Sequence, residues 1–195
     1  MNKIAKIIRV LTISPIMALM ICLVIYFGVD DSFSSVLIFL ITIFCLVVFP
    51  VLAYPFEQKV NILKRFNNTL TPRAADRKMA IIFSVISYLV ALLVVFLNHE
   101  STIVKQLVLT YFISGVLIAI SSFAFKFEAS GHMCGMVGPM VFLAVKVSYW
   151  FLLILIPLAF VVWSSLKLKR HTVLQLIFGS LMPVVGFIIS LIVIS

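Results

Sequence analysis

The stretch MCGMVGPMVFLAVKVSYWFLLILIPLAFVVW, residues 133–163, decides how many helices this chain forms. As one helix it would be about 46 Å long at 1.5 Å per residue, well beyond the roughly 30 Å hydrocarbon core of a bilayer. One helix would also bury Lys146 near its middle, where a charge is costly. Two short helices, over about 132–146 and 149–165 with a turn near Lys146, avoid both costs.

Apolar runs also make up most of the remaining chain. Of 195 residues, 64% are hydrophobic and 11% are charged, and the mean hydropathy is +1.30. These values exclude a soluble domain and predict a polytopic α-helical membrane protein. We therefore expect an all-α fold: a transmembrane bundle of about seven helices, with six as the alternative, in one domain over residues 1–195. The other expected spans are 8–27, 35–54, 79–97, 103–125 and 173–194.

The net charge of +9 is distributed in a pattern that indicates topology rather than nucleic-acid binding. All but two of the 15 Lys and Arg residues fall in the clusters 3–9, 59–78, 126 and 167–170, whereas the acidic residues 30, 31 and 100 lie in the other loops. This is the positive-inside pattern, so we expect an integral protein of the plasma membrane with a cytoplasmic N-terminus. Basic loops also attract anionic lipid headgroups or phosphorylated substrates, and no nucleic acid is expected as a partner.

Two polar segments, 126–132 and 163–172, each contain a histidine at the end of an apolar run. With seven helices both segments lie on the cytoplasmic face, as does the loop 55–78, in which Thr71 and Pro72 have the pattern of a helix start. With six helices the two histidines would lie on opposite faces and could not share a site. The positive-inside rule and the chemistry therefore favour the same number of helices.

His132 and His171, with basic neighbours, suit phosphate-ester chemistry. One imidazole attacks phosphorus, the other handles the proton of the leaving group, and Lys and Arg balance the charge. The simpler interpretation of an interfacial histidine is a capping or anchoring residue, and it suits His99 best. The three cysteines are scattered and favour core packing, so no metal and no cofactor are predicted.

The segment Ser130-Gly131-His132 resembles the second signature of the type 2 phosphatidic acid phosphatase superfamily, Pro-Ser-Gly-His, with Ala129 in the Pro position. The superfamily's third signature is Ser-Arg, five residues, His, three residues, Asp. In this chain Ser164 and Ser165 precede five residues, then His171 and, after three more, Gln175, so the spacing matches without a gap. The resemblance covers roughly residues 55–190, and His-Thr-x-x-Gln is similar to the branch containing dolichyl-diphosphatase-type enzymes.

The resemblance implies a role for each matching residue. His171 would be the nucleophile that forms a phosphohistidine, and His132 would protonate the leaving group and later help to activate water. Ser130 and the backbone of Gly131 would bind phosphate oxygens. Gln175 would orient His171 through its other ring nitrogen, and Ser164 would help to orient the site. We expect the two imidazoles within about 6 Å of each other, a gap that a phosphate bridges by hydrogen bonds.

The chain departs from the family pattern at its cations. Ser165 stands where the family has Arg, and no Lys in residues 55–78 has an Arg seven positions later, so the first signature, Lys, six residues, Arg-Pro, is absent in strict form. Arg73 and Arg77 lie one helical turn apart and are the predicted replacements, with Lys126 and Arg170 as further phosphate-binding candidates.

The function that follows is an integral membrane phosphatase that acts on a lipid phosphate or diphosphate, with an isoprenoid preferred, through a phosphohistidine and without a metal. Its expected partners are the bilayer and this lipid substrate, and its active site is expected on the cytoplasmic face. The alternative, supported by Ser165, is a catalytically lapsed relative that binds a phospholipid or a membrane partner. The sequence fixes neither the lipid tail nor the oligomeric state.

Overall fold

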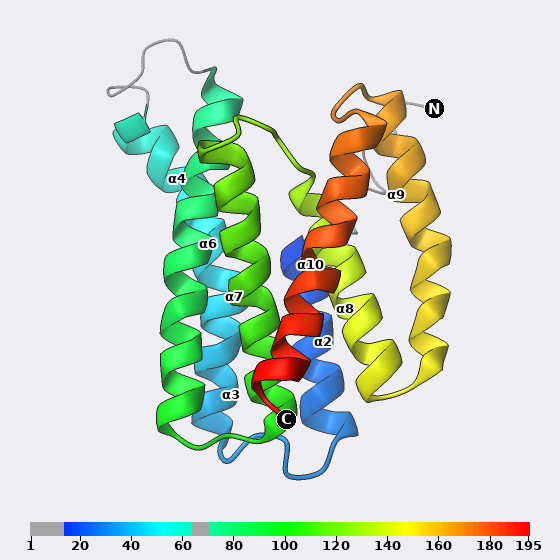
Figure 1. Ribbon diagram of the computed structural model, residues 1–195. Helices are drawn as coiled ribbons and strands as arrows, with labels where there is room; N and C mark the ends of the chain where they lie inside the picture. Colours follow the sequence, from blue (N-terminus) through cyan, green and yellow to red (C-terminus); the bar gives the residue numbers. More distant parts are fainter. Residues whose placement is uncertain (1–13, 64–70) are drawn as a thin grey trace.

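The computed structural model describes residues 14–63 and 71–195, and every regular element within these two ranges is helical (Figure 1). Seven helical stretches follow one another in this part of the chain, so the prediction of an all-α bundle with seven helices rather than six is confirmed. In chain order they are α2 (Ser14–Gly28), the continuous stretch α3 (Val36–Ile43), π-helix η1 (Phe44–Val48) and α4 (Phe49–Val60), then α6 (Pro72–Leu97), α7 (Thr102–Phe123), α8 (Gly131–Lys146), the stretch of 3-10 helix η2 (Tyr149–Ile154) and α9 (Leu155–Lys167), and α10 (Val173–Val193).

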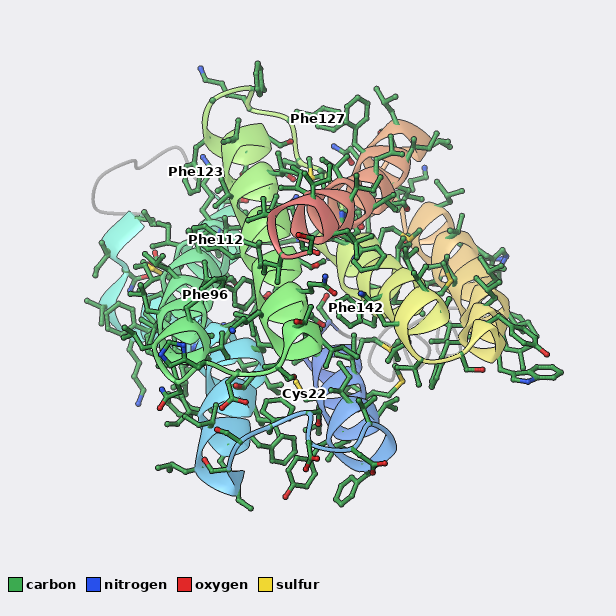
Figure 2. All side chains as sticks on the ribbon, turned by 60° about the horizontal axis from the view of Figure 1, so that its bottom comes forward. Cys22, Phe96, Phe112, Phe123, Phe127 and Phe142 are labelled. Atoms are coloured by element: carbon green, nitrogen blue, oxygen red, sulfur yellow. The ribbon has the colours of Figure 1, made fainter. Side chains whose placement is uncertain are left out.

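The surface and interior of the bundle are those of an integral membrane protein. Five of the stretches are long and apolar enough to cross a membrane, and the apolar helices α2 and α8 are shorter, at about 22 and 24 Å. Figure 2 shows side chains radiating from the outer faces of the helices, among them Phe96 and Phe123, which are each 43% exposed. Cys22 and Phe142 lie in the interior and are fully buried. Apolar residues therefore cover the surface that faces lipid as well as the core.

The turn that separates α8 from η2 lies where the sequence predicts it. The backbone N–H groups of Val147 and Ser148 both donate to the carbonyl oxygen of Leu143, each at 2.9 Å, which ends α8. Ser148 is then extended and caps η2, since its hydroxyl accepts the N–H of Trp150 at 3.4 Å. Lys146 consequently lies at the end of a short helix and not in the middle of a long one, and the predicted division of residues 133–163 into two helices is confirmed.

The loop that was expected over residues 55–78 is shorter in the structure. α4 continues through Pro55 to Val60 and α6 begins at Pro72, because polar and charged residues extend a transmembrane helix into the headgroup region without ending it. Thr71 caps α6 as predicted, with its hydroxyl accepting the N–H of Ala74 at 3.3 Å. Residues 8–13 of the first expected span lie outside the described residues.

The helices α6, α8 and α10 all begin at one end of the bundle, where α4, α7 and α9 end (Figure 1). The segments that contain His132 and His171 are therefore at the same end, as the seven-helix topology requires. At the opposite end two loops are joined by hydrogen bonds: Ser34 N–H donates to the Glu100 carboxylate at 2.9 Å, and the Ser101 hydroxyl donates to the Ser32 carbonyl at 2.5 Å.

This topology predicts the outcome of cysteine-accessibility labelling. Single cysteines at the exposed positions Asp30 and Tyr149 should react with an impermeant reagent from one side of the membrane, and those at Lys126 and Lys167 from the other. The three native cysteines are buried and give little background. Labelling of Tyr149→Cys from the same side as Lys126→Cys would contradict the turn after Lys146.

Candidate functional site

A cavity of about 950 Å³ extends into the bundle from the end at which α6, α8 and α10 begin. Its walls come from α2, the stretch η1–α4, α6, α7, α8 and α10. Near the helix starts its lining contains four basic side chains from three separate segments: Arg73, Arg77, His132 and His171. With Gly131, which also lines it, the structure thus brings five of the sequence-predicted site residues into one cavity.

The two arginines lie in the first turns of α6, and they differ in their surroundings. Arg73 is exposed, whereas Arg77 is half-buried and reaches the segment before α8. Its Nη1 lies 2.5 Å from a carboxylate oxygen of Glu128, and its Nη2 donates to the carbonyl oxygen of Ala129 at 2.6 Å. Arg77 therefore fixes the segment that leads to His132 and adds positive charge, partly balanced by Glu128, to the cavity wall.

The start of α8 places Gly131 and His132 in the cavity wall but buries Ser130. Ser130 caps α8 through its hydroxyl, which accepts the N–H of Met133 at 3.4 Å, and its own N–H donates to the carbonyl of Gln175 at 2.9 Å. Ser130 is fully buried and does not line the cavity, so in this structure it shapes the helix start. The N-terminus of α8, with its partial positive charge, is directed toward this end of the cavity and favours an anion there.

Gln175 determines which nitrogen of His171 carries a proton. The side-chain oxygen of Gln175 accepts the N–H of Thr172 at 3.0 Å and lies 3.2 Å from His171 Nδ1. Because an amide oxygen only accepts hydrogen bonds, the proton in this pair belongs to Nδ1, and in the neutral ring the lone pair is on Nε2. The Gln175 N–H in turn donates to the Thr172 hydroxyl, which completes a capping box at the start of α10. The arrangement thus fixes the tautomer of the neutral His171 ring.

Gly179 allows α10 to approach the backbone of Ser130. A Cβ atom at Gly179 would lie 2.4 Å from the Ser130 carbonyl oxygen and 2.9 Å from its nitrogen, distances that no side chain tolerates. Together with the hydrogen bond from Ser130 N–H to Gln175, this contact holds the start of α8 against the start of α10. Sequence reasoning gave Gly179 no role, because the contact depends on how the two helices cross.

Four other sequence-predicted residues, Lys126, Arg170, Ser164 and Gln175, do not line the cavity, and neither does Ser165. Lys126 and Arg170 are exposed, at the same end of the bundle. Ser164 is fully buried, and its hydroxyl donates to the carbonyl of Val161 at 3.0 Å. Ser165, in the position of the family's arginine, is also fully buried, and its hydroxyl has no hydrogen-bond partner among the described residues. The structure therefore offers Arg73 and Arg77, and neither Lys126 nor Arg170, as the cations of the cavity.

Sequence reasoning missed the deeper residues of the cavity, which come mainly from α6 and α7. Ser84 and Tyr88 continue the face of α6 that carries Arg77, and Tyr111 and Ser114 face them from α7. The helical spacing of positions 77, 84 and 88 is a signal that could have identified this face. Within residues 14–63 and 71–195 no cluster of His, Cys, Asp and Glu is suited to a metal ion.

No protein-family model matches this chain, and no curated protein and no solved structure is similar enough to count as a match. The fold and the cavity define an integral membrane helical bundle with a histidine- and arginine-containing cavity at one end. Its function has to be argued from the chemistry of that cavity.

The contact at Gly179 makes a prediction about stability. Gly179→Ala should lower the free energy of unfolding by about 1–3 kcal/mol, the usual cost of overpacking, because the backbone of Ser130 has no room to move away. Gly28→Ala is the matched control, since a Cβ atom there meets nothing within 4 Å. Both can be measured by denaturation of the purified protein in micelles. Equal stability of the two variants would show that the α8–α10 contact is not as close as described.

Proposed function

We propose that this protein is an integral membrane phosphatase that hydrolyses a lipid phosphate or diphosphate of isoprenoid type. The observation that carries the proposal is that His132 and His171, far apart in the sequence, line one cavity together with Arg73 and Arg77. Two imidazoles and two guanidinium groups are the components that a metal-independent phosphoryl transfer uses. The resemblance of the segments around both histidines to the type 2 phosphatidic acid phosphatase signatures supports the same chemistry.

In the first half of the proposed reaction, His171 Nε2 attacks phosphorus. A P–N bond forms, the bond between phosphorus and the leaving oxygen breaks, and His132, protonated at the start, donates its proton to that oxygen. The products are a lipid alcohol, or a lipid monophosphate from a diphosphate, and a phosphohistidine. Gln175 keeps Nδ1 of His171 protonated and the ring in place, because its oxygen is also fixed by the N–H of Thr172.

In the second half, neutral His132 takes a proton from a water molecule, whose oxygen attacks the phosphohistidine. The P–N bond breaks, inorganic phosphate leaves, and His171 and His132 return to their initial protonation states. Arg73 and Arg77 balance the negative charge on the phosphoryl oxygens in both steps.

The position of the cavity supports a lipid substrate over a soluble phosphate. Its polar end contains the histidines and arginines, and its remaining walls, formed by transmembrane helices, contain such apolar residues as Leu46, Ile81 and Ile118. An amphiphile with a phosphate headgroup matches this division, with its chain between the helices.

We propose that this active site lies on the cytoplasmic face of the plasma membrane. The positive-inside rule supports the cytoplasmic side, because basic residues of the described chain gather at the same end of the bundle. The labelling experiment given for the fold tests this orientation as well. In intact cells a cysteine at Lys126 should be protected from an impermeant reagent added outside. Thr69, a further labelling position in the basic loop 55–78, lies outside the described residues.

The second candidate function is phospholipid binding without turnover, as expected of a lapsed relative. Two observations favour it: Glu128 and Ala129 already engage the Arg77 guanidinium, and Ser165 supplies no cation in the arginine position. The two candidates differ in one measurable property, which is the release of phosphate from a bound lipid.

The histidine assignments predict the kinetics of three variants. His171→Ala should abolish turnover, and His132→Ala should lower kcat by at least about 10²-fold, the scale of acid–base catalysis. The double variant should be no slower than His171→Ala, because both residues act in one covalent cycle. His99→Ala, at the other end of the bundle, is the control and should keep wild-type activity. Phosphate release from isoprenoid and glycerolipid phosphates gives the rates, and full activity in His171→Ala would remove the nucleophile assignment.

Removing either partner of the Arg77–Glu128 ion pair should have different effects on kcat/KM. Arg77→Ala should lower kcat/KM. The loss of transition-state stabilisation should be about 1–3 kcal/mol, the range for losing a charge-assisted bond, and Arg73→Ala should act in the same direction. Glu128→Gln weakens the anchoring contact but keeps the cation, so it should leave kcat/KM equal or higher. Lys126→Ala, outside the cavity, is a further control.

Equal losses in Arg77→Ala and Glu128→Gln would show that Arg77 acts only as an anchor. Ser165→Arg tests the converse, because it restores the arginine that the family has at this position. Because Ser165 is fully buried, an arginine there should destabilise the protein without raising its activity. A sharp rise in turnover would instead show that the arginine position is still usable.

A further inference from the structure

The cavity continues well beyond its polar end. Along α6 its lining runs from Arg77 to Tyr88, which is about 16 Å of helix at 1.5 Å per residue. His171, just before α10, and Pro183, within α10, also line it. A chain attached to a phosphate near the histidines therefore has about 16 Å of cavity to occupy.

Two tyrosines lie at the deep end. The rings of Tyr88 on α6 and Tyr111 on α7 meet edge to face, with their centroids 5.6 Å apart and their planes at 82°. Beyond them the bundle is closely packed: Ala91, Leu107 and Phe142 are at most 1% exposed and belong to one core cluster. Figure 2, which turns the opposite end of the bundle forward, shows Phe142 inside it. The described residues thus close the cavity behind the two rings.

The volume of the cavity limits what it can hold. At about 30 Å³ for a group the size of a water molecule, 950 Å³ holds roughly thirty non-hydrogen groups. A phosphate with a single hydrocarbon chain fits within this limit. A glycerophospholipid with two ordinary acyl chains does not fit wholly inside it.

Gly115 determines where the Tyr88 ring lies. A Cβ atom at Gly115 would be 3.2 Å from Cδ2 and 3.4 Å from Cε2 of Tyr88, so the ring lies directly against the backbone of α7. A side chain at this position would force the ring to shift by a few tenths of an ångström or more. The depth of the cavity consequently depends on a glycine and a tyrosine from neighbouring helices.

We propose that Tyr88 and Tyr111 limit the length of the lipid chain, and that the ligand is a single-chain lipid phosphate whose chain ends at their rings. The inference rests on the proposed function for the position of the phosphate, near His132 and His171. The inference adds the class of substrate, a phosphate on one short chain. It also assigns the selection of chain length to Tyr88 and Tyr111.

The test measures equilibrium binding of hexyl, dodecyl and octadecyl phosphate and of dipalmitoyl phosphatidic acid to the full-length protein in nanodiscs, with empty nanodiscs subtracted. In the wild type, affinity should increase from hexyl to dodecyl phosphate and fall about tenfold or more for octadecyl phosphate and for the two-chain lipid. Tyr88→Ala removes one of the two rings that close the deep end of the cavity. It should raise the affinity for octadecyl phosphate to about that for dodecyl phosphate. Gly115→Ala should weaken dodecyl binding and leave hexyl binding unchanged.

Tyr149→Ala is the matched control, because Tyr149 is 66% exposed on the outer surface and should not influence chain length. Cooperative thermal unfolding of each variant shows that it is folded. Equal affinity of the wild type for dodecyl and octadecyl phosphate, or an unchanged preference in folded Tyr88→Ala and Gly115→Ala, would overturn the inference.

Hydrolysis of the same compounds is measured separately and distinguishes the two proposals. A length preference in binding without any phosphate release would reject the phosphatase and support the chain-length limit. Phosphate release with no dependence on chain length would reject only the chain-length limit.

Discussion

The close contact between Ser130 and Gly179 is the constraint on which the arrangement of the site depends. It joins the N-terminus of α8 to the first turns of α10 through the hydrogen bond from Ser130 N–H to the Gln175 carbonyl, at 2.9 Å. The residue two positions after Ser130 is His132, and the residue four positions before Gln175 is His171. One backbone contact thus holds both histidines at the same end of one cavity.

Other polar groups within the bundle join its helices to one another, and two of them, Thr110 and Ser114, also line the deep part of the cavity. The Thr110 hydroxyl donates to Ser190 at 3.0 Å, and Gln106 donates to the carbonyl of Ile194 at 2.5 Å, so these side chains join α7 to α10. Gly186 brings the same two helices close, since a Cβ there would lie 2.8 Å from the Ser114 hydroxyl. Hydrogen bonds and small residues of this kind hold transmembrane helices together. The arginines and histidines instead gather around a cavity, which is the arrangement expected of a binding site.

The sequence predicts those features that depend on local patterns. The length of residues 133–163 and the charge of Lys146 are local, and they yield the correct number of helices and hence the shared end of the two histidines. The buried position of Ser165, the pairing of Arg77 with Glu128 and the contact at Gly179 all depend on which helix faces which. Tyr88 and Tyr111 were missed for the same reason: the spacing of positions 77, 84 and 88 marks one face of a helix, but what that face meets depends on the neighbouring helices.

The most direct measurement for the central claim is detection of the covalent intermediate. Purified protein is mixed with dodecyl phosphate labelled with radioactive phosphorus, quenched in alkali, digested and analysed by mass spectrometry. We expect an acid-labile phosphoryl group on His171, present in the wild type and absent from His171→Ala. Phosphate release without any phosphohistidine, or a phosphoryl group on another residue, would contradict the proposed roles of the two histidines.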